Sequence, residues 1–209
     1  MAGPARNRDL HGAAPDTAPV ALLLIDVIND MEYRGGDRLL VHALPVARRL
    51  AALVRRARAL DIPVVYVNDN FGRWRSDFTA LVRHCLGHRV RGRPVARLLR
   101  PRRDDYFVLK PKHSGFFATP LDTLLTYLGT ETLVLTGLTT DRCILFTAAD
   151  AYMRDLRLLV PRDCVAAIEP DDHARALLHM QRILRTDLTP STDLDLPALA
   201  RRRRPRRAA

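Results

Sequence analysis

The chain has 209 residues, 47% of them hydrophobic, and it carries 34 lysines and arginines against 23 acidic residues, a formal net charge of +11. This length can bury one sizeable core, and the even spread of apolar residues favours one α/β domain over two small ones. The longest apolar runs are too short to span a bilayer, so we expect no membrane partner.

Two end segments differ in composition from the rest of the chain. Residues 1–18 are rich in Ala, Pro and charge, and we expect a flexible N-terminal arm there. Residues 196–209 end in "RRRRPRRAA", and without its six arginines the net charge falls to about +5. We expect a disordered basic tail. A nucleic-acid contact is the alternative, but no interleaved aromatic residues support it.

The three cysteines, Cys85, Cys143 and Cys164, are odd in number and widely spaced. This is not the pattern of a disulfide scaffold, so we expect a reducing, cytoplasmic environment.

Apolar runs of strand length alternate with longer segments of helical period. Strands are predicted at 20–26, 62–69, 106–110, 132–137 and 156–163, with a short strand or tail near 186–190. Helices are predicted at 45–60, 77–87, 141–155 and 170–184. Pro45 would stand at the first position of its helix, where the missing N–H costs nothing. The alternation predicts one three-layer α/β/α domain over residues 19–195, with a doubly wound, mostly parallel sheet.

Reactive side chains follow three of the predicted strands. Asp26 ends the first, Lys110 ends the third, and Cys143 opens the helix after the fourth. Ligands of open parallel sheets bind at the carboxyl ends of the strands, so these groups are expected at one edge. A carboxylate, an ammonium and a thiol together suit nucleophilic catalysis.

Cys143 is expected in the first turn of its helix, with Thr140 or Asp141 as the N-cap. The positive end of the helix dipole would there favour the thiolate. The alternative is a buried cysteine that packs as a small hydrophobe, the role we expect for Cys85 and Cys164.

Asp26 and Lys110 each have an ordinary structural alternative. A buried carboxylate at Asp26 with a raised pKa could take a proton from the thiol, but it could also be a helix N-cap or an ion-pair partner. Lys110 could stabilise both anions or could be a solvated surface lysine, and Lys112 competes for the same role.

Three stretches in order resemble the motifs of the isochorismatase-like cysteine hydrolases, a superfamily that includes nicotinamidases, N-carbamoyl amidohydrolases and isochorismatases. "LLLIDVINDM" resembles the first motif, with Asp26, Asn29 and Asp30. "KPKHSGFFATPLDTLL" resembles the lysine motif around Lys110, and "LTGLTTDRCILFTAADA" resembles the nucleophile motif around Cys143. The resemblance runs from about residue 20 to about residue 192.

The resemblance implies a covalent mechanism. Asp26 would accept the proton of Cys143 while Lys110 stabilises the charges, and the thiolate would attack a carbonyl. Backbone N–H groups of Thr139 and Cys143 would form the oxyanion hole, with a cis peptide between Leu138 and Thr139. Asp26 would then protonate the leaving amine, and water would hydrolyse the thioester.

Departures from the motifs limit the substrate assignment. Metal-binding nicotinamidases carry an Asp and two His after the second strand, whereas "NDNFGRWRSDF" has Asp69 and no histidine. We therefore expect no metal and no cofactor, and nicotinamide is disfavoured. Met31, Phe116 and Trp74 are the expected pocket residues, although Trp74 could instead pack on arginine stems.

The sequence thus predicts a hydrolase of the C–N bond in a small amide or ureido (N-carbamoyl) compound. One alternative is a vinyl-ether hydrolase of the isochorismatase type, which has no use for a nucleophilic cysteine. Another is a non-catalytic binding relative of the fold. The resemblance also implies a homo-oligomer.

Overall fold

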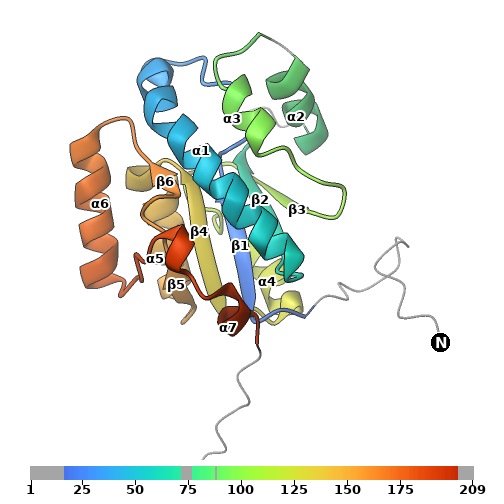
Figure 1. Cartoon of the computed structure of the whole chain (residues 1–209), viewed down its shortest axis with the longest axis vertical. Coiled ribbons are helices and arrows are strands. Elements are labelled where there is room, and N and C mark those ends of the chain that lie inside the picture. Colours follow the sequence, from blue (N-terminus) through green and yellow to red (C-terminus); the bar gives the residue numbers. More distant parts are fainter. Residues whose placement is uncertain (1–16, 72–76, 88, 202–209) are drawn as a thin grey trace, which may run out of the picture.

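The computed structural model describes residues 17–71, 77–87 and 89–201, and its centre is a parallel β-sheet. The strands are β1 Val20–Ile25, β2 Val64–Asp69, β3 Tyr106–Lys110, β4 Thr132–Leu138, β5 Arg157–Leu159 and β6 Val165–Ala166. Their order is β3-β2-β1-β4-β5, with β6 paired to the end of β4, and each of these pairs is parallel (Figure 1). The strand order reverses at β1, so the crevice expected for ligands lies beyond its carboxyl end.

Helices cover both faces of this sheet. They are α1 Gly36–Ala59, α2 Phe78–Gly87, α3 Arg93–Leu98, α4 Leu121–Leu128, α5 Leu145–Tyr152, α6 Pro170–Ile183 and α7 Leu196–Ala200. A π-helical segment spans Thr140–Ile144, and a 3₁₀ turn spans Ser191–Asp193.

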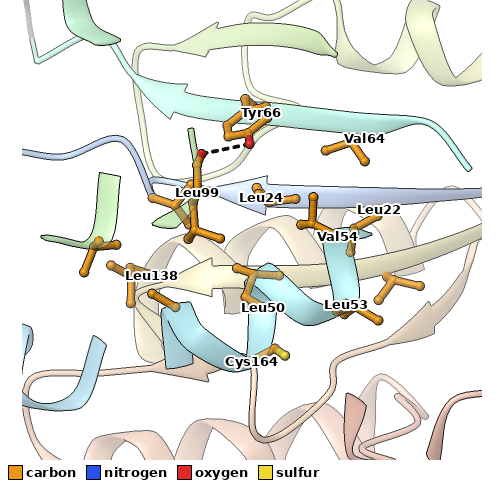
Figure 2. Close-up of a cluster of buried hydrophobic side chains, with 14 of the residues drawn as sticks. Leu22, Leu24, Leu50, Leu53, Val54, Val64, Tyr66, Leu99, Leu138 and Cys164 are labelled. Carbon is orange, nitrogen blue, oxygen red and sulfur yellow. Dashed lines mark hydrogen bonds between the residues drawn. The ribbon is translucent and has the colours of Figure 1, made fainter. Parts of the chain in front are cut away.

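The alternation of side chains along β1 separates two hydrophobic clusters. Leu22 and Leu24 pack toward α1, α2, α3 and α7 in one cluster, which Figure 2 shows around Leu50 and Tyr66. Leu23 and Ile25 pack on the other face with α4, α5 and α6. Because successive strand residues point to opposite faces, a wholly apolar β1 can fill both layers. The predicted three-layer α/β architecture is confirmed.

Helix α1 begins nine residues earlier than predicted, so Pro45 lies inside the helix rather than at its first position. Proline cannot donate to the carbonyl four residues before it, that of Val41. Val41 is 69% exposed, so water can reach this part of the helix. Leu39 and Ala43 lie before the proline on the apolar face of α1. Burial of that face stabilises the helical turns on the N-terminal side of Pro45.

Some helices and strands of the structure were not predicted from the sequence. Helix α3 lies in the basic connector, and α4 follows the lysine motif. The predicted strand 156–163 is only three residues long, since Pro161 cannot donate to a sheet, and the short β6 follows it.

The C-terminal segment is folded further than predicted. Helix α7 lies within the predicted tail, and its Leu196 is 2% exposed. Arg56 of α1 donates hydrogen bonds to the carbonyls of Ser191 (2.6 Å) and Leu194 (2.7 Å), which hold the approach to α7. The tail boundary at residue 196 was therefore wrong, and at least residues 196–200 belong to the domain.

The predicted N-terminal arm up to residue 16 and the tail from residue 202 lie outside the described residues. Within the described ranges, no helix has both the length and the apolar character needed to cross a membrane.

Candidate active site

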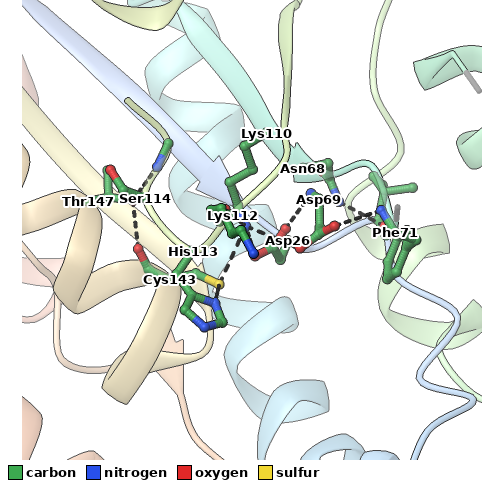
Figure 3. A network of polar contacts seen from close by, with 12 residues as sticks. Asp26, Asn68, Asp69, Phe71, Lys110, Lys112, His113, Ser114, Cys143 and Thr147 are labelled. Atoms are coloured by element: carbon green, nitrogen blue, oxygen red, sulfur yellow. Dashed lines mark hydrogen bonds and ion pairs between the residues drawn. The ribbon is translucent and has the colours of Figure 1, made fainter. Parts of the chain in front are cut away.

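Asp26, Lys110 and Cys143 meet at the carboxyl edge of the sheet, as their positions after the strands predicted (Figure 3). Asp26 follows β1 directly and has a left-handed φ of 52°, a conformation that Asp adopts more readily than most residues. Lys110 is the last residue of β3, and Cys143 lies in the π-helical segment after β4. Three separate elements thus supply the three groups.

The ammonium of Lys110 is the centre of this cluster. Its Nζ lies 2.9 Å from Oδ2 of Asp26, 3.5 Å from Sγ of Cys143 and 3.8 Å from Oδ2 of Asp69. It also donates to the carbonyl of Lys112 at 3.1 Å. The side chain is fully buried. Lys110 is therefore not the solvated surface lysine of the alternative interpretation, and Lys112 contributes its carbonyl oxygen.

The carboxylate of Asp26 is enclosed by donors. Besides the contact with Lys110, its Oδ1 accepts the backbone N–H of Asp69 at 2.7 Å. Burial raises the pKa of Asp26, while the positive charge of Lys110 and the hydrogen bond from Cys143 work in the opposite direction. Burial alone would lower the pKa of Lys110, but the negative charge of Asp26, joined by that of Cys143 when the thiol ionises, raises it above its usual value. Lys110 is consequently an ammonium at neutral pH.

The surroundings of Cys143 favour the protonated thiol over the thiolate. Burial, followed by the negative charge of Asp26, raises its pKa to about 12, although Lys110 acts to lower it. Burial and the neighbouring carboxylate therefore oppose the thiolate that the helix position was expected to favour. A neutral thiol that is hydrogen-bonded to a carboxylate can still lose its proton as the sulfur attacks a carbonyl.

The backbone around Cys143 differs from the predicted α-helical first turn. The carbonyl of Thr139 accepts hydrogen bonds from the N–H of Arg142 (3.2 Å) and of Ile144 (3.1 Å), the second of which spans the wider π-type turn. Thr139 precedes the segment in extended conformation, and the peptide bond between Leu138 and Thr139 is cis.

The predicted N-caps have other partners, so the capping prediction was wrong. The hydroxyl of Thr140 lies 2.9 Å from Nδ1 of His173, and Asp141 forms an ion pair with Arg142 at 3.5 Å. No side chain caps the π-helical segment within the described part of the chain.

Thr147 of α5 connects the segment that carries Cys143 to the loop that follows Lys110. Its buried hydroxyl donates to the carbonyl of Cys143 at 2.6 Å and accepts the N–H of Gly115 at 2.9 Å (Figure 3). Ser114 of the same loop donates to Asp150 on α5. These contacts fix the loop and α5 relative to each other.

A cavity of about 310 Å³ lies beside this cluster. Its lining residues are Asp30, Glu32, Tyr33, Asp69, Asn70, Phe71, Ala80, Leu81, His84 and Leu109. Asp69 is shared with the Lys110 network. Burial and then the charges of Asp26, Asp30 and Cys143 raise the pKa of Tyr33 to about 12, so Tyr33 is electrostatically close to the same cluster. Asp69 thus connects the cavity to the cluster, although Asp26, Lys110 and Cys143 are not among its lining residues.

Two of the three expected pocket residues lie in the hydrophobic core. Met31 is fully buried in the cluster under α1, and Phe116 is buried in the opposite cluster with the guanidinium of Arg154 over its ring at 4.5 Å. Neither is among the lining residues of the cavity. Trp74 lies outside the described residues.

Asp69 and His113 were not identified as site residues from the sequence, although both lie near the cluster. Asp69 was considered only as an insufficient metal ligand, yet it contacts both Asp26 and Lys110. His113 lies with Nδ1 3.9 Å from Sγ of Cys143. Its position three residues after Lys110, within the lysine motif, was the available signal. The described residues contain no group of three or more His, Cys, Asp or Glu side chains that could hold a metal ion.

Comparison with known proteins agrees with the fold and the motifs. The isochorismatase domain model matches residues 20–189. The uncharacterized isochorismatase family protein YaaI of Bacillus subtilis is 36% identical over 172 residues, which cover 82% of this chain and 94% of that protein. The ureidoacrylate amidohydrolase RutB of Methylorubrum extorquens is 30% identical over 183 residues, with 74% of this chain and 73% of that protein covered.

Among solved structures, N-carbamoylsarcosine amidase from Thermoplasma acidophilum superposes with a TM-score of 0.64 at 27% identity. The match covers 84% of this chain and 98% of that chain. Because the domain model and these relatives match most of its length, the chain belongs to the isochorismatase family.

Proposed function

We propose that this protein is a cysteine-dependent hydrolase that cleaves the C–N bond of a small amide or ureido compound through a thioester on Cys143. The observation that carries the proposal is the position of Lys110, whose ammonium lies 2.9 Å from Asp26 and 3.5 Å from Cys143 in a buried place. The named activities of two relatives, a ureidoacrylate amidohydrolase and an N-carbamoylsarcosine amidase, support amide hydrolysis in general.

The first half of the reaction forms the thioester. Asp26 takes the proton of the Cys143 thiol as the sulfur attacks the carbonyl carbon, and Lys110 balances the negative charge that remains. The N–H groups of Thr139 and Cys143 receive the oxyanion.

The second half releases the products. Protonated Asp26 gives its proton to the leaving nitrogen as the C–N bond breaks. Water then attacks the thioester carbonyl, the C–S bond breaks, and the acid product leaves. The buried ammonium of Lys110 compensates the Asp26 carboxylate before that group takes the proton and again after it gives the proton up.

A panel of small amides and ureido acids, assayed for ammonia release, tests the proposal. Cys143→Ala is expected to lower turnover of any substrate found by roughly a thousand-fold or more, with an unchanged circular dichroism spectrum. Lys112→Ala is the matched control, because Lys112 has an exposed side chain and contributes only its backbone carbonyl. Amide turnover that survives Cys143→Ala would rule out the thioester on Cys143. Vinyl-ether hydrolysis releases no ammonia, so that alternative needs a separate assay for the alcohol and carbonyl products of a vinyl ether. The absence of turnover across a broad panel would favour a binding protein.

A further inference from the structure

The imidazole of His113 is a second base beside the sulfur of Cys143, on a different side from the Lys110 ammonium. Figure 3 shows the sulfur between these two groups, with Nδ1 of His113 at 3.9 Å and Nζ of Lys110 at 3.5 Å. His113 comes from the loop after β3 and is exposed to solvent. Its ring packs at 5.6 Å, centroid to centroid, against the ring of Phe146 on α5. The imidazole is thus held near the sulfur from outside the buried cluster.

Asp26, the other base in the site, is poorly placed to take a proton from a water molecule. Asp26 is 6% exposed, and its two carboxylate oxygens are engaged by the N–H of Asp69 and by Lys110. These contacts suit a group that exchanges a proton with a thiol beside it. A water molecule that enters from solvent to attack an acyl group on Cys143 meets the exposed imidazole of His113 without passing the buried ion pair.

We propose that His113 is the general base of thioester hydrolysis, the second half of the reaction proposed above. In the neutral tautomer with its proton on Nε2, Nδ1 accepts a proton. Nδ1 takes this proton from the water as the water oxygen bonds to the acyl carbon. The tetrahedral intermediate then collapses, the C–S bond breaks, and the imidazolium returns its proton to the sulfur. The acid product leaves, and the neutral thiol and imidazole are restored with no other reactant.

Two substitutions separate this role from packing. His113→Asn keeps a polar atom near the position of Nδ1 but has no basicity, and His113→Phe keeps the ring against Phe146. Under the proposal, both variants form the thioester at close to the wild-type rate and hydrolyse it 100-fold or more slowly, within the range typical of general base catalysis. Single-turnover kinetics with intact-protein mass spectrometry should then show an acyl adduct that reaches a higher level and decays more slowly in the variants than in the wild type.

Hydroxylamine supplies a readout that loss of packing would not produce. It attacks a thioester without a general base, so hydroxamate formation by the His113 variants should stay near the wild-type rate while acid formation falls. His42→Asn, at a histidine on α1, is the control and should leave both rates unchanged. The inference is overturned if both His113 variants hydrolyse the thioester at the wild-type rate, or if acid and hydroxamate fall together. The inference rests on the proposed function, whose own failure would be seen separately as full turnover by Cys143→Ala.

Discussion

At the scale of single residues, burial is the largest cause of the raised pKa of Cys85, Cys143 and Cys164. Cys85 and Cys164 are fully buried, and burial raises the pKa of each to about 12, with the negative charges of Asp30 and Asp163 adding to the shift. Cys143 follows the same rule at the edge of the sheet. Under the proposed function, Cys143 therefore depends on a neighbouring base rather than on a stable thiolate.

The raised thiol pKa values predict a loss of stability at alkaline pH. A thiol that ionises near pH 9 in the unfolded chain and near pH 12 in the folded protein contributes its stability fully below pH 9 and loses it as pH rises toward 12. Each such thiol adds at most about 1.4 kcal/mol per pH unit to the slope. Urea unfolding at several pH values should show the free energy of unfolding falling above pH 9, and less steeply for Cys164→Ala.

Val165→Ala is the control for that comparison. Val165 is also buried and lies next to Cys164, but it has no proton to lose. This variant should be less stable at every pH and keep the wild-type slope. Equal slopes for Cys164→Ala and the wild type would show that the buried thiol does not govern alkaline unfolding.

At the scale of elements, the site depends on contacts between the loop after β3 and the segment after β4. Thr147 makes the most direct of these contacts, because its hydroxyl bonds both the Cys143 carbonyl and the Gly115 N–H. The loop in turn supplies the Lys112 carbonyl to Lys110 and brings His113 to the sulfur. A change in this contact should therefore affect catalysis without touching a reacting atom.

Thr147→Val is expected to lower kcat about 10-fold and the free energy of unfolding by about 1–3 kcal/mol, since it leaves the buried N–H of Gly115 without the hydroxyl that accepts its hydrogen bond. KM should change much less than kcat. Thr126→Val is the matched control, because Thr126 makes the same type of hydrogen bond to the carbonyl four residues earlier, on the exposed part of α4. Wild-type kcat in Thr147→Val would contradict a positioning role for this contact.

The elements also show what could be predicted from the sequence. Strand β3 has the predicted bounds, since charged residues precede "YFVLK" and a proline follows it. The meeting of Asp26, Lys110 and Cys143 follows from the rule that parallel strands end at one edge. By contrast, nothing in "TTDRCI" signals a π-type turn, because that turn depends on which N–H groups reach the Thr139 carbonyl.

The remaining differences depend on tertiary packing. The thiol pKa of Cys143 could not be foreseen without knowing that burial and Asp26 together outweigh Lys110. The position of His113 depends on the path of a loop, which motif spacing does not determine. Pro45 was predicted to begin its helix because proline favours the first helical position. In the structure, the apolar face of α1 continues on both sides of Pro45, and its burial outweighs that local preference.

At the scale of the whole molecule, the C-terminal segment packs against the hydrophobic cluster that includes α1 and so forms part of the folded domain. Leu196 of α7 is buried against the cluster that includes α1, and Arg56 holds the approach to it through two carbonyls. This part of the chain was expected to be a disordered tail. Its burial implies that the domain needs residues up to about 200 for full stability.

Leu196→Ala is expected to lower the free energy of unfolding by about 2–3 kcal/mol, the usual cost of a buried leucine truncation. A chain that ends at Arg201, which lacks most of the arginine tail, should keep wild-type stability and turnover at physiological salt. Urea unfolding and the ammonia assay check both statements. A large loss of stability or turnover in the shortened chain, together with no loss of stability in Leu196→Ala, would contradict this account. It would mean that the residues after Arg201, rather than Leu196, stabilise the domain.

Self-association is expected from the family resemblance and is a separate property of the whole molecule. Sedimentation velocity over a range of protein concentrations would determine it, and a monomer throughout that range would show the expectation to be wrong.

The central claim is that Cys143 carries the acyl group during hydrolysis, and rapid quenching followed by mass spectrometry tests it most directly. Wild-type protein mixed with an amide substrate and quenched in acid should show a mass increase equal to the acyl group, located by peptide mapping to Cys143. Hydroxylamine should remove the adduct, and Cys143→Ala should not form it. Turnover of the substrate by Cys143→Ala at the wild-type rate, or an adduct located on Cys85 or Cys164, would contradict the account.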